Sequence, residues 1–182
     1  MVKRIFSNDS RKARYAWAAL RIGMGWIFLW SFIDKLFGLG FSTCRDSATG
    51  VINYMCESAW INGGSPTFGF LSFATKGPFA DYFKSISSSV TVEWLFMLGL
   101  LFVGITLIFG ILVRLGSLSG IAMLLLMYLA GFLLPVHNPI LDEHIMYSII
   151  LVGIILADAG RTCGFEGRWS RLWIVQRFPI LR

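Results

Sequence analysis

Four long apolar stretches alternate with polar segments along the chain, and this pattern predicts four membrane-spanning helices. The stretches cover residues 15–36, 92–113, 115–134 and 144–160. An α-helix needs roughly 20 residues to cross a bilayer, and these stretches have close to that length. We therefore expect an all-α membrane protein, a four-helix bundle in which residues 1–182 form a single domain.

The composition supports a membrane location and indicates how the chain crosses. Hydrophobic residues make up 56% of the chain and charged residues only 14%, with a mean hydropathy of +0.70. The net charge of +6 does not indicate nucleic-acid binding, because the basic residues gather at the two ends of the chain. In membrane proteins such clusters stay in the cytoplasm and contact lipid headgroups, so both termini are expected to be cytoplasmic.

Two segments outside the expected spans are expected to have structure of their own, a long loop and the C-terminal tail. Residues 41–91 are expected to form an extracytoplasmic loop between the first two helices, with aromatic runs too short to span a membrane. Residues 164–182 place Trp169 and Trp173 on one helical face beside several arginines. That pattern predicts an amphipathic tail helix on the inner membrane surface, and the alternative is a solvated basic end.

An inner layer of ionisable residues is expected to hold the helices together. Ionisable groups within a span are costly and usually face a protein interior or a watery cavity. Arg21 and Asp158 are expected to form an ion pair between the first and fourth helices. Arg114, at the inner end of the second helix, is expected to cap carbonyl groups or reach the lipid headgroups.

An outer layer is richer in candidate chemistry. It mixes acids, a lysine and a histidine, namely Asp34, Lys35, Glu93, Asp142, Glu143 and His144. Histidine titrates near neutral pH, so His144 with Glu93 could pass protons, and Lys35 is the one cation of this layer. We take Lys35, Glu93 and His144 as candidate catalytic residues. A fixed ion-pair network that locks the helices together is the alternative.

The cysteines fall on both sides of the expected membrane. Cys44 and Cys56 lie in the extracytoplasmic loop, where disulfides persist, and Cys163 lies inside, where thiols stay reduced. A Cys44–Cys56 disulfide is expected, either as a structural cross-link or as a redox-active pair. No cysteine or histidine spacing is typical of a metal site, and no nucleotide-binding loop for a flavin is present, so neither cofactor is expected.

The turn over residues 62–67 is a candidate anion site. Glycines let the backbone approach a ligand, and Ser65 before Pro66 is a good helix start with free N–H groups. Together with nearby basic side chains the turn would suit a small dianion. The candidate substrate-binding residues are Lys35, Arg45, Asn62, Gly63, Gly64 and Ser65.

Five sequence motifs together resemble one family. They are residues 20–36, residues 60–67, Glu93 with residues 110–114, residues 138–144, and residues 158–161. These motifs resemble the DoxX/DoxD family of small four-helix membrane proteins from bacteria and archaea. The resemblance covers roughly residues 15–165, and its outer-loop motif is similar to the longer, DoxD-like branch. It implies a location in the bacterial or archaeal plasma membrane.

The resemblance also implies an activity. DoxD is the membrane subunit of thiosulfate:quinone oxidoreductase, which joins two thiosulfates into tetrathionate and passes two electrons to a quinone. It works with a small subunit, DoxA, so a DoxA-like or other oxidoreductase subunit is expected as a partner. The chain could also form a homo-oligomer.

We therefore interpret the chain as a subunit of a quinone-linked sulfur oxidoreductase. Thiosulfate would bind at the glycine turn, and the quinone ring would lie among four aromatic residues, Trp26, Trp30, Phe32 and Trp94. One alternative is a quinone-coupled thiol oxidant that relays a disulfide through Cys44 and Cys56. The other is a non-catalytic membrane scaffold or small-anion carrier.

Overall fold

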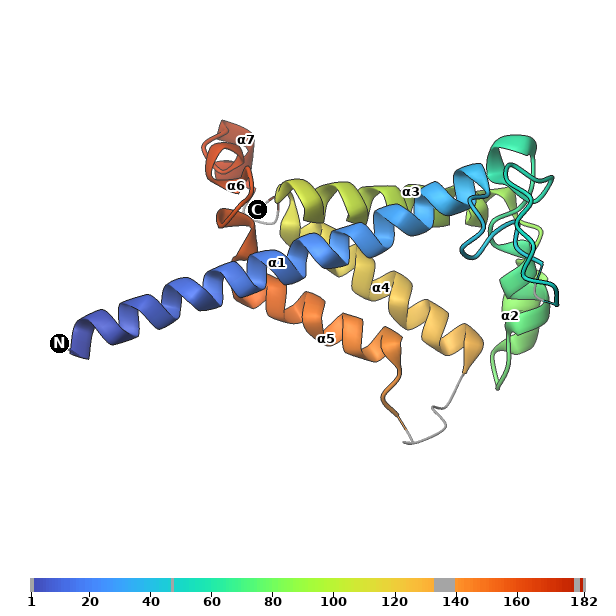
Figure 1. The fold of residues 1–182 in the computed structure, drawn as a ribbon, viewed down its shortest axis with the longest axis horizontal. Helices are drawn as coiled ribbons and strands as arrows, with labels where there is room; N and C mark the ends of the chain where they lie inside the picture. Colours follow the sequence, from blue (N-terminus) through green and yellow to red (C-terminus); the bar gives the residue numbers. More distant parts are fainter. Residues whose placement is uncertain (1, 47, 133–139, 179–180, 182) are drawn as a thin grey trace.

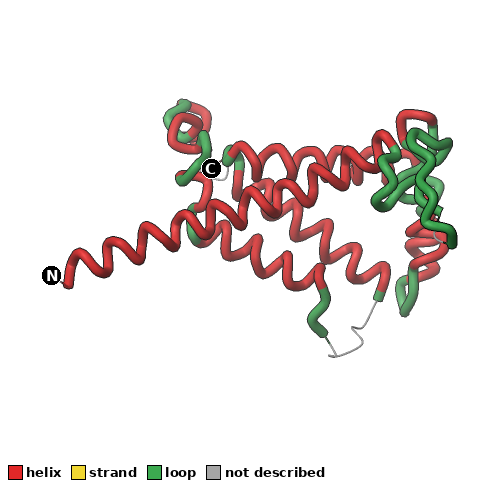
Figure 2. Tube along the Cα trace, viewed as in Figure 1, coloured by secondary structure: helices red, strands yellow, loops and turns green. Residues whose placement is uncertain are grey.

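The protein is all-helical in the part of the chain that the structure describes. The computed structural model describes residues 2–46, 48–132, 140–178 and 181, which fold into helices joined by loops (Figure 2). No β-strand occurs among these residues, where an isolated antiparallel bridge pairs Arg45 with Ile52. The expected all-α class is therefore confirmed.

Four longer helices form the body of the molecule, and short helical segments cluster at its ends (Figure 1). The longer helices are α1 (Val2–Phe37), α3 (Val90–Phe109), α4 (Val113–Gly131) and α5 (Glu143–Leu156). The short segments are η1 (Trp60–Asn62), η2 (Phe70–Ala74), α2 (Ala80–Ser85), η3 (Ala159–Arg161), α6 (Glu166–Trp169) and α7 (Trp173–Arg177).

Three of the longer helices are long and apolar enough to cross a membrane. The apolar segments are Arg11–Phe37 of α1, all of α3 and all of α4. The fourth helix, α5, is apolar but has only 14 residues, fewer than the roughly 20 that span a bilayer. These helices are consistent with a multi-pass membrane protein, and the expected fourth crossing rests on a shorter helix than the sequence indicated.

The helix ends differ from the expected bounds because backbone turns interrupt the apolar runs. The helix expected over 92–113 stops at Phe109, since Gly110 adopts a left-handed conformation with φ 66°. The next helix begins at Val113, directly after Leu112 at φ 53°. A short turn thus joins α3 to α4.

The longer helices pack around one apolar core. Helix α1 contacts α3 and α5, while α4 contacts both α3 and α5. The core draws buried side chains from all four, including Met24, Phe28, Met97, Leu124 and Leu151.

Helices α1 and α3 approach each other closely through glycines. A Cβ atom added to Gly104 would lie 2.9 Å from the backbone nitrogen of Leu29, and one added to Gly25 would lie 2.9 Å from the backbone nitrogen of Ile108. Small residues at helix contacts are typical of membrane proteins, because they let backbones pack directly.

The segments between the helices gather at the two ends of the molecule (Figure 1). Residues 38–89, including η1, η2 and α2, lie beyond the C-terminal end of α1. We call this the Lys35 end. The short helices α6 and α7 lie at the opposite end, beside the C-terminal end of α3, and the first turns of α1 extend away from the other helices. We call this the Arg21 end.

The sequence predicted one amphipathic helix in the C-terminal tail, but the structure does not form it. The tail forms two short helices, α6 and α7, with residues 170–172 between them. Glu166 and Val175 are buried, and the indole nitrogen of Trp169 donates a hydrogen bond to the carbonyl of Leu181 at 2.6 Å. The tail therefore folds partly onto itself, although Trp173 is largely exposed.

Candidate functional site

At the Arg21 end, Arg21 is completely buried and binds backbone carbonyls. Its Nη1 atom donates hydrogen bonds to the carbonyls of Leu107 and Ile108, the latter at 3.1 Å. Its Nη2 atom donates to the carbonyls of Thr162 and Cys163, at 3.3 and 2.8 Å. The carbonyls in the last turn of a helix have no partner within that helix. Arg21 therefore ties the end of α3 to the segment that follows η3.

The expected ion pair between Arg21 and Asp158 does not form. Asp158 instead lies 3.2 Å from Arg114 and 3.9 Å from Arg161. The prediction assumed that Asp158 continues the helical face of α5, but α5 ends at Leu156 and Asp158 adopts φ 46°. The Arg114 and Asp158 side chains are about 40% exposed, so water weakens their attraction.

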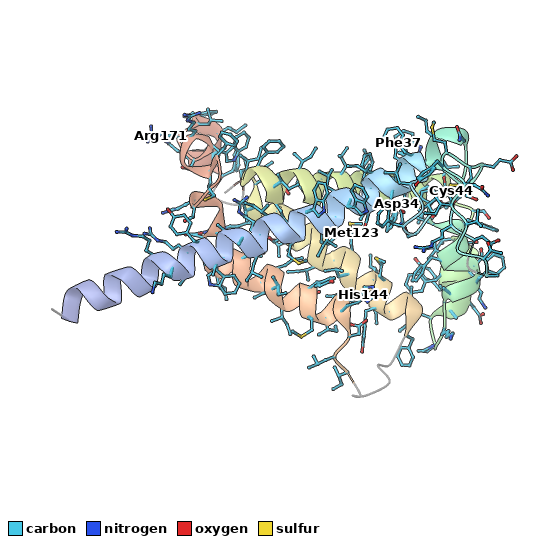
Figure 3. All side chains as sticks on the ribbon, in the orientation of Figure 1. Asp34, Phe37, Cys44, Met123, His144 and Arg171 are labelled. Atoms are coloured by element: carbon cyan, nitrogen blue, oxygen red, sulfur yellow. A yellow bond between two sulfur atoms is a disulfide. The ribbon has the colours of Figure 1, made fainter. Side chains whose placement is uncertain are left out.

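At the Lys35 end, Asp34 organises the loop that follows α1. Its side chain is buried, and its carboxylate accepts hydrogen bonds from the backbone N–H groups of Phe41, Ser42 and Thr43, at 3.0, 2.9 and 3.1 Å. The Ser42 hydroxyl donates a fourth at 2.7 Å. Gly38, at φ 64°, lets the chain reverse so that these residues return to Asp34. Figure 3 shows Asp34 and Cys44 close to this end of the molecule.

A cavity of about 980 Å³ opens beside the same loop. Its polar side is formed by Lys35, Ser42, Thr43, Cys44, Glu57 and Thr67, and its apolar wall includes Phe83, Leu95, Phe96, Met123, Leu126 and Met127 from α2, α3 and α4. Small-molecule sites are typically mostly apolar cavities of about 300–1,000 Å³ with a few polar groups. This cavity has that size and that division of surface.

Lys35 has hydrogen-bonding capacity left for a ligand in the cavity, and the Thr67 hydroxyl is fully buried and, among the described residues, unpaired. The Lys35 ammonium donates to the Ser42 hydroxyl at 3.0 Å, and an ammonium carries three N–H donors. The Thr67 side chain is only 5% exposed, and its buried hydroxyl has no hydrogen-bond partner among the described residues. Buried polar groups are usually paired. The arrangement suits a ligand with a hydrogen-bond acceptor and an apolar body.

The glycine turn uses its own donors within the loop. The N–H groups of Gly63 and Gly64 both donate to carbonyls at 3.1 Å, those of Trp60 and Ala59. Gly63 is left-handed at φ 85° after η1, and a Cβ atom on Gly64 would lie 2.3 Å from the carbonyl carbon of Ser58. Both glycines are thus explained by packing and backbone conformation.

The other residues expected at the anion site also have local roles. The Asn62 side-chain amide donates to the carbonyl of Met55 at 2.6 Å. Ser65 accepts a hydrogen bond from the N–H of Phe68 at 3.1 Å. The helix expected to start at Pro66 is η2, which begins at Phe70 with Gly69 at its N-cap position. Arg45 is exposed and does not line the cavity. Of the six expected substrate-binding residues, those that line the cavity are Lys35, Gly64 and Ser65.

The three expected catalytic residues are not joined by any hydrogen bond or ion pair. The Nδ1 atom of His144 lies 2.6 Å from the carboxylate of Asp142, which also caps α5 by accepting from the N–H of Ile145. Glu93 is half-buried in the first turn of α3 and does not line the cavity, unlike Lys35. Figure 3 shows His144 well away from the loop around Asp34.

The four aromatic residues expected to surround a quinone make contacts other than with the cavity. Trp26 and Trp30 stack on each other at 5.5 Å, while Trp94 packs edge-on against Trp60 at 4.7 Å. Phe32 packs against the apolar core. None of the four lines the cavity at the Lys35 end.

A disulfide joins Cys44 to Cys56 within the loop. Both cysteines are half-buried, and Cys44 also lines the cavity. A Cβ atom on Gly38 would lie 2.3 Å from the Cys44 sulfur, so this position must be a glycine for the disulfide to pack where it does. The cross-link thus lies beside the polar side of the cavity.

A second acidic residue of this loop, Asp46, accepts hydrogen bonds from the backbone of the turn that follows it. The backbone N–H groups of Thr49 and Ala48 donate to the Asp46 carboxylate, at 2.7 and 2.9 Å. These hydrogen bonds, that of Thr49 first, hold the pKa of Asp46 below its ordinary value, since they stabilise the ionised form. Among the described residues, no group of three or more His, Cys, Asp or Glu side chains is placed to hold a metal ion.

The fold and the cavity define a class of protein, an all-helical chain with membrane-type helices and a half-polar cavity at one end. Comparison with known protein families, with characterised proteins and with solved structures finds no match. The resemblance to the DoxX/DoxD family therefore stays a prediction from the sequence motifs.

Proposed function

We propose that the chain is a membrane subunit of the DoxX/DoxD type that binds a quinone in the cavity at the Lys35 end. In this proposal the membrane domain is a four-helix bundle with both termini in the cytoplasm and residues 38–89 on the opposite side. Helix α5 is the fourth crossing. Its apolar sequence and its packing against α1 and α4 support that role, and the flanking residues 140–142 and 157–161 extend its reach.

The observation that carries the proposal is the division of the cavity into a polar side and an apolar wall. A quinone has a flat apolar ring with carbonyl acceptors and an apolar tail. Lys35 would donate hydrogen bonds to a quinone carbonyl, and side chains such as Phe96 and Met127 would hold the ring and tail. When bound, a quinone accepts two electrons and two protons. The proposed quinone site thus moves from the four expected aromatic residues to this cavity.

The proposed electron donor is a sulfur compound. The sequence resemblance supports thiosulfate, with a DoxA-like small subunit as partner. Forming the S–S bond of tetrathionate from two thiosulfates releases two electrons, which is the number that reduction of one quinone consumes. The two protons come from the surrounding water. The positive charge of Lys35 at the polar side of the cavity would attract the dianion.

Filling the cavity tests whether it binds the quinone. The full chain, purified in lipid nanodiscs, would be titrated with a short-chain ubiquinone analogue. Met127→Trp adds bulk to the apolar wall and should abolish binding, whereas Met146→Trp, on exposed α5 surface outside the cavity, should leave it unchanged. Equal binding by both variants would place the quinone elsewhere. No binding by the unmodified chain would favour a scaffold or small-anion carrier.

A quinone-coupled thiol oxidant is a second candidate, because Cys44 lines the same cavity as Lys35. A partner dithiol would reduce the Cys44–Cys56 disulfide. Re-forming it would then pass two electrons and two protons to the quinone. Removing both cysteines, by Cys44→Ser with Cys56→Ser, separates the candidates. It should abolish quinone reduction by dithiothreitol if this candidate holds, and it should spare thiosulfate-dependent reduction if the first one does.

A further inference from the structure

A second cavity, of about 360 Å³, opens at the Arg21 end of the molecule. It is lined by Arg11, Arg14, Tyr15, Arg161, Thr162 and Cys163. The first three residues come from α1 and the last three from η3 and the segment after it. Packing of α1 against η3 therefore brings together three guanidinium groups from opposite ends of the sequence.

The described lining of this cleft is cationic, and none of the described residues that line it is acidic. One carboxylate approaches from outside, since Asp158 lies 3.9 Å from Arg161. The same carboxylate is closer to Arg114, at 3.2 Å, so its charge is shared between two arginines. Arg11 and Arg14 form no salt bridge with a described residue. A guanidinium binds phosphate oxygens with two parallel hydrogen bonds, which an ammonium cannot do.

The cleft lies at the end of α1 where the expected membrane span begins. Arg11 and Arg14 directly precede the apolar run over residues 15–36 that is expected to cross the membrane. The neighbouring helix α5 ends at Leu156, just before η3, and Leu156 is 81% exposed. Arginines at the boundary of a span, beside an exposed apolar side chain, match a molecule that is anionic at one end and apolar at the other.

We propose that this cleft binds the phosphate group of an anionic glycerophospholipid, whose acyl chains lie along the apolar surfaces of α1 and α5. Arg11, Arg14 and Arg161 bind the phosphate oxygens, and Tyr15 and Thr162, which line the same space, offer hydroxyl groups as further donors. Free phosphate shares the headgroup chemistry but lacks the acyl chains. The site is independent of the quinone cavity, which lies at the other end of the helices.

Cys163 provides a reporter of occupancy within the cleft itself. It is exposed and free, while the other two cysteines form the disulfide. A neutral maleimide should therefore react at this one thiol in the full chain. In detergent, adding phosphatidylglycerol should slow the alkylation several-fold, and adding phosphatidylcholine should not. Equal protection by both lipids, or by sodium phosphate as strongly as by phosphatidylglycerol, would overturn the proposal.

A matched pair of variants tests the role of the arginines. Arg11→Gln with Arg14→Gln removes two charges, three residues apart, from the cleft. Arg168→Gln with Arg171→Gln removes two charges with the same spacing from exposed positions at the same end of the molecule, outside the cleft. Figure 3 shows Arg171 on the C-terminal segment.

The first double variant should weaken phosphatidylglycerol binding about tenfold or more, whereas the second should change it less than twofold. Equal losses would mean that membrane-surface charge, and not this cleft, attracts the lipid. If the first variant does not fold, as judged by circular dichroism, Arg161→Gln removes the arginine contributed by η3. It should weaken the protection of Cys163 in the same way, and full protection in that variant would contradict the proposal.

Discussion

Replacing Arg21 by leucine should destabilise the protein strongly, because its buried guanidinium donates hydrogen bonds to four backbone carbonyls. The side chain is 0% exposed. Two of its acceptors, Leu107 and Ile108, are in the last turn of α3. Leucine fills part of the volume but donates no hydrogen bond, so those carbonyls would stay buried without this partner.

The magnitude follows from the number of contacts and from the cost of burying the charge. Each hydrogen bond to a charged group contributes about 1.5–3 kcal/mol. Burial of the guanidinium offsets several kcal/mol of this total. Each of the two α3 carbonyls left buried without its donor costs about 1–3 kcal/mol, or about 2–6 kcal/mol together. We expect Arg21→Leu to lower the free energy of unfolding by that amount. Arg114→Leu, at a half-exposed ion pair, should cost about 1 kcal/mol or less.

A double-mutant cycle tests the geometry behind these numbers. Unfolding of each variant in mixed micelles, followed by circular dichroism, gives the free energies. Asp158→Asn should not rescue Arg21→Leu, because Asp158 binds Arg114 and Arg161 instead of Arg21. The two effects should add to within about 0.5 kcal/mol. Rescue of Arg21→Leu by Asp158→Asn would refute the carbonyl contacts and restore the ion pair expected from the sequence.

Three further predictions concern packing, the loop and topology. Gly104→Ala should cost about 1–3 kcal/mol of stability, because its Cβ atom would press on the backbone of α1. Gly23→Ala should be tolerated, because a Cβ atom there has no neighbour within 4 Å, and thermal unfolding compares the two variants. Asp34→Ala should weaken quinone binding about tenfold or more by releasing residues 41–43, while Asp46→Ala should not. Titration with the quinone analogue measures both affinities, and equal affinities would contradict this role of Asp34. Cys163 should react with impermeant maleimide only from the cytoplasmic face and a tag at residue 48 only from the other, and labelling of both from one face would exclude the proposed topology.

The helices could be predicted from the sequence because apolar residues cluster in long runs whatever their partners are. The ends of the helices could not be predicted as well. Gly110 and Leu112 turn the chain inside an apolar stretch, so the periodic pattern continues across a helix boundary. The same limitation affected Asp158, which was expected within a helix over residues 144–160 but lies past the end of α5.

The candidate site was harder to predict, because its decisive contacts involve the backbone. Sequence patterns pair Arg21 with a carboxylate and leave Asp34 as one charge among several, yet both side chains bind main-chain groups of distant or reversing segments. Lys35 was identified as the important cation from its position on α1. The apolar wall that faces its cavity comes from α2, α3 and α4, and only their packing brings it there.

The most direct test of the central claim is the affinity of the full chain for a short-chain ubiquinone analogue, with and without the Lys35 ammonium. Lys35→Met keeps the length of the side chain and removes a charged donor, which contributes about 1.5–3 kcal/mol. The account predicts that this change weakens quinone binding about tenfold to a hundredfold, while Lys84→Met, outside the cavity, leaves it unchanged. Unchanged affinity in Lys35→Met, or equal losses in both variants, would contradict a quinone site built around Lys35.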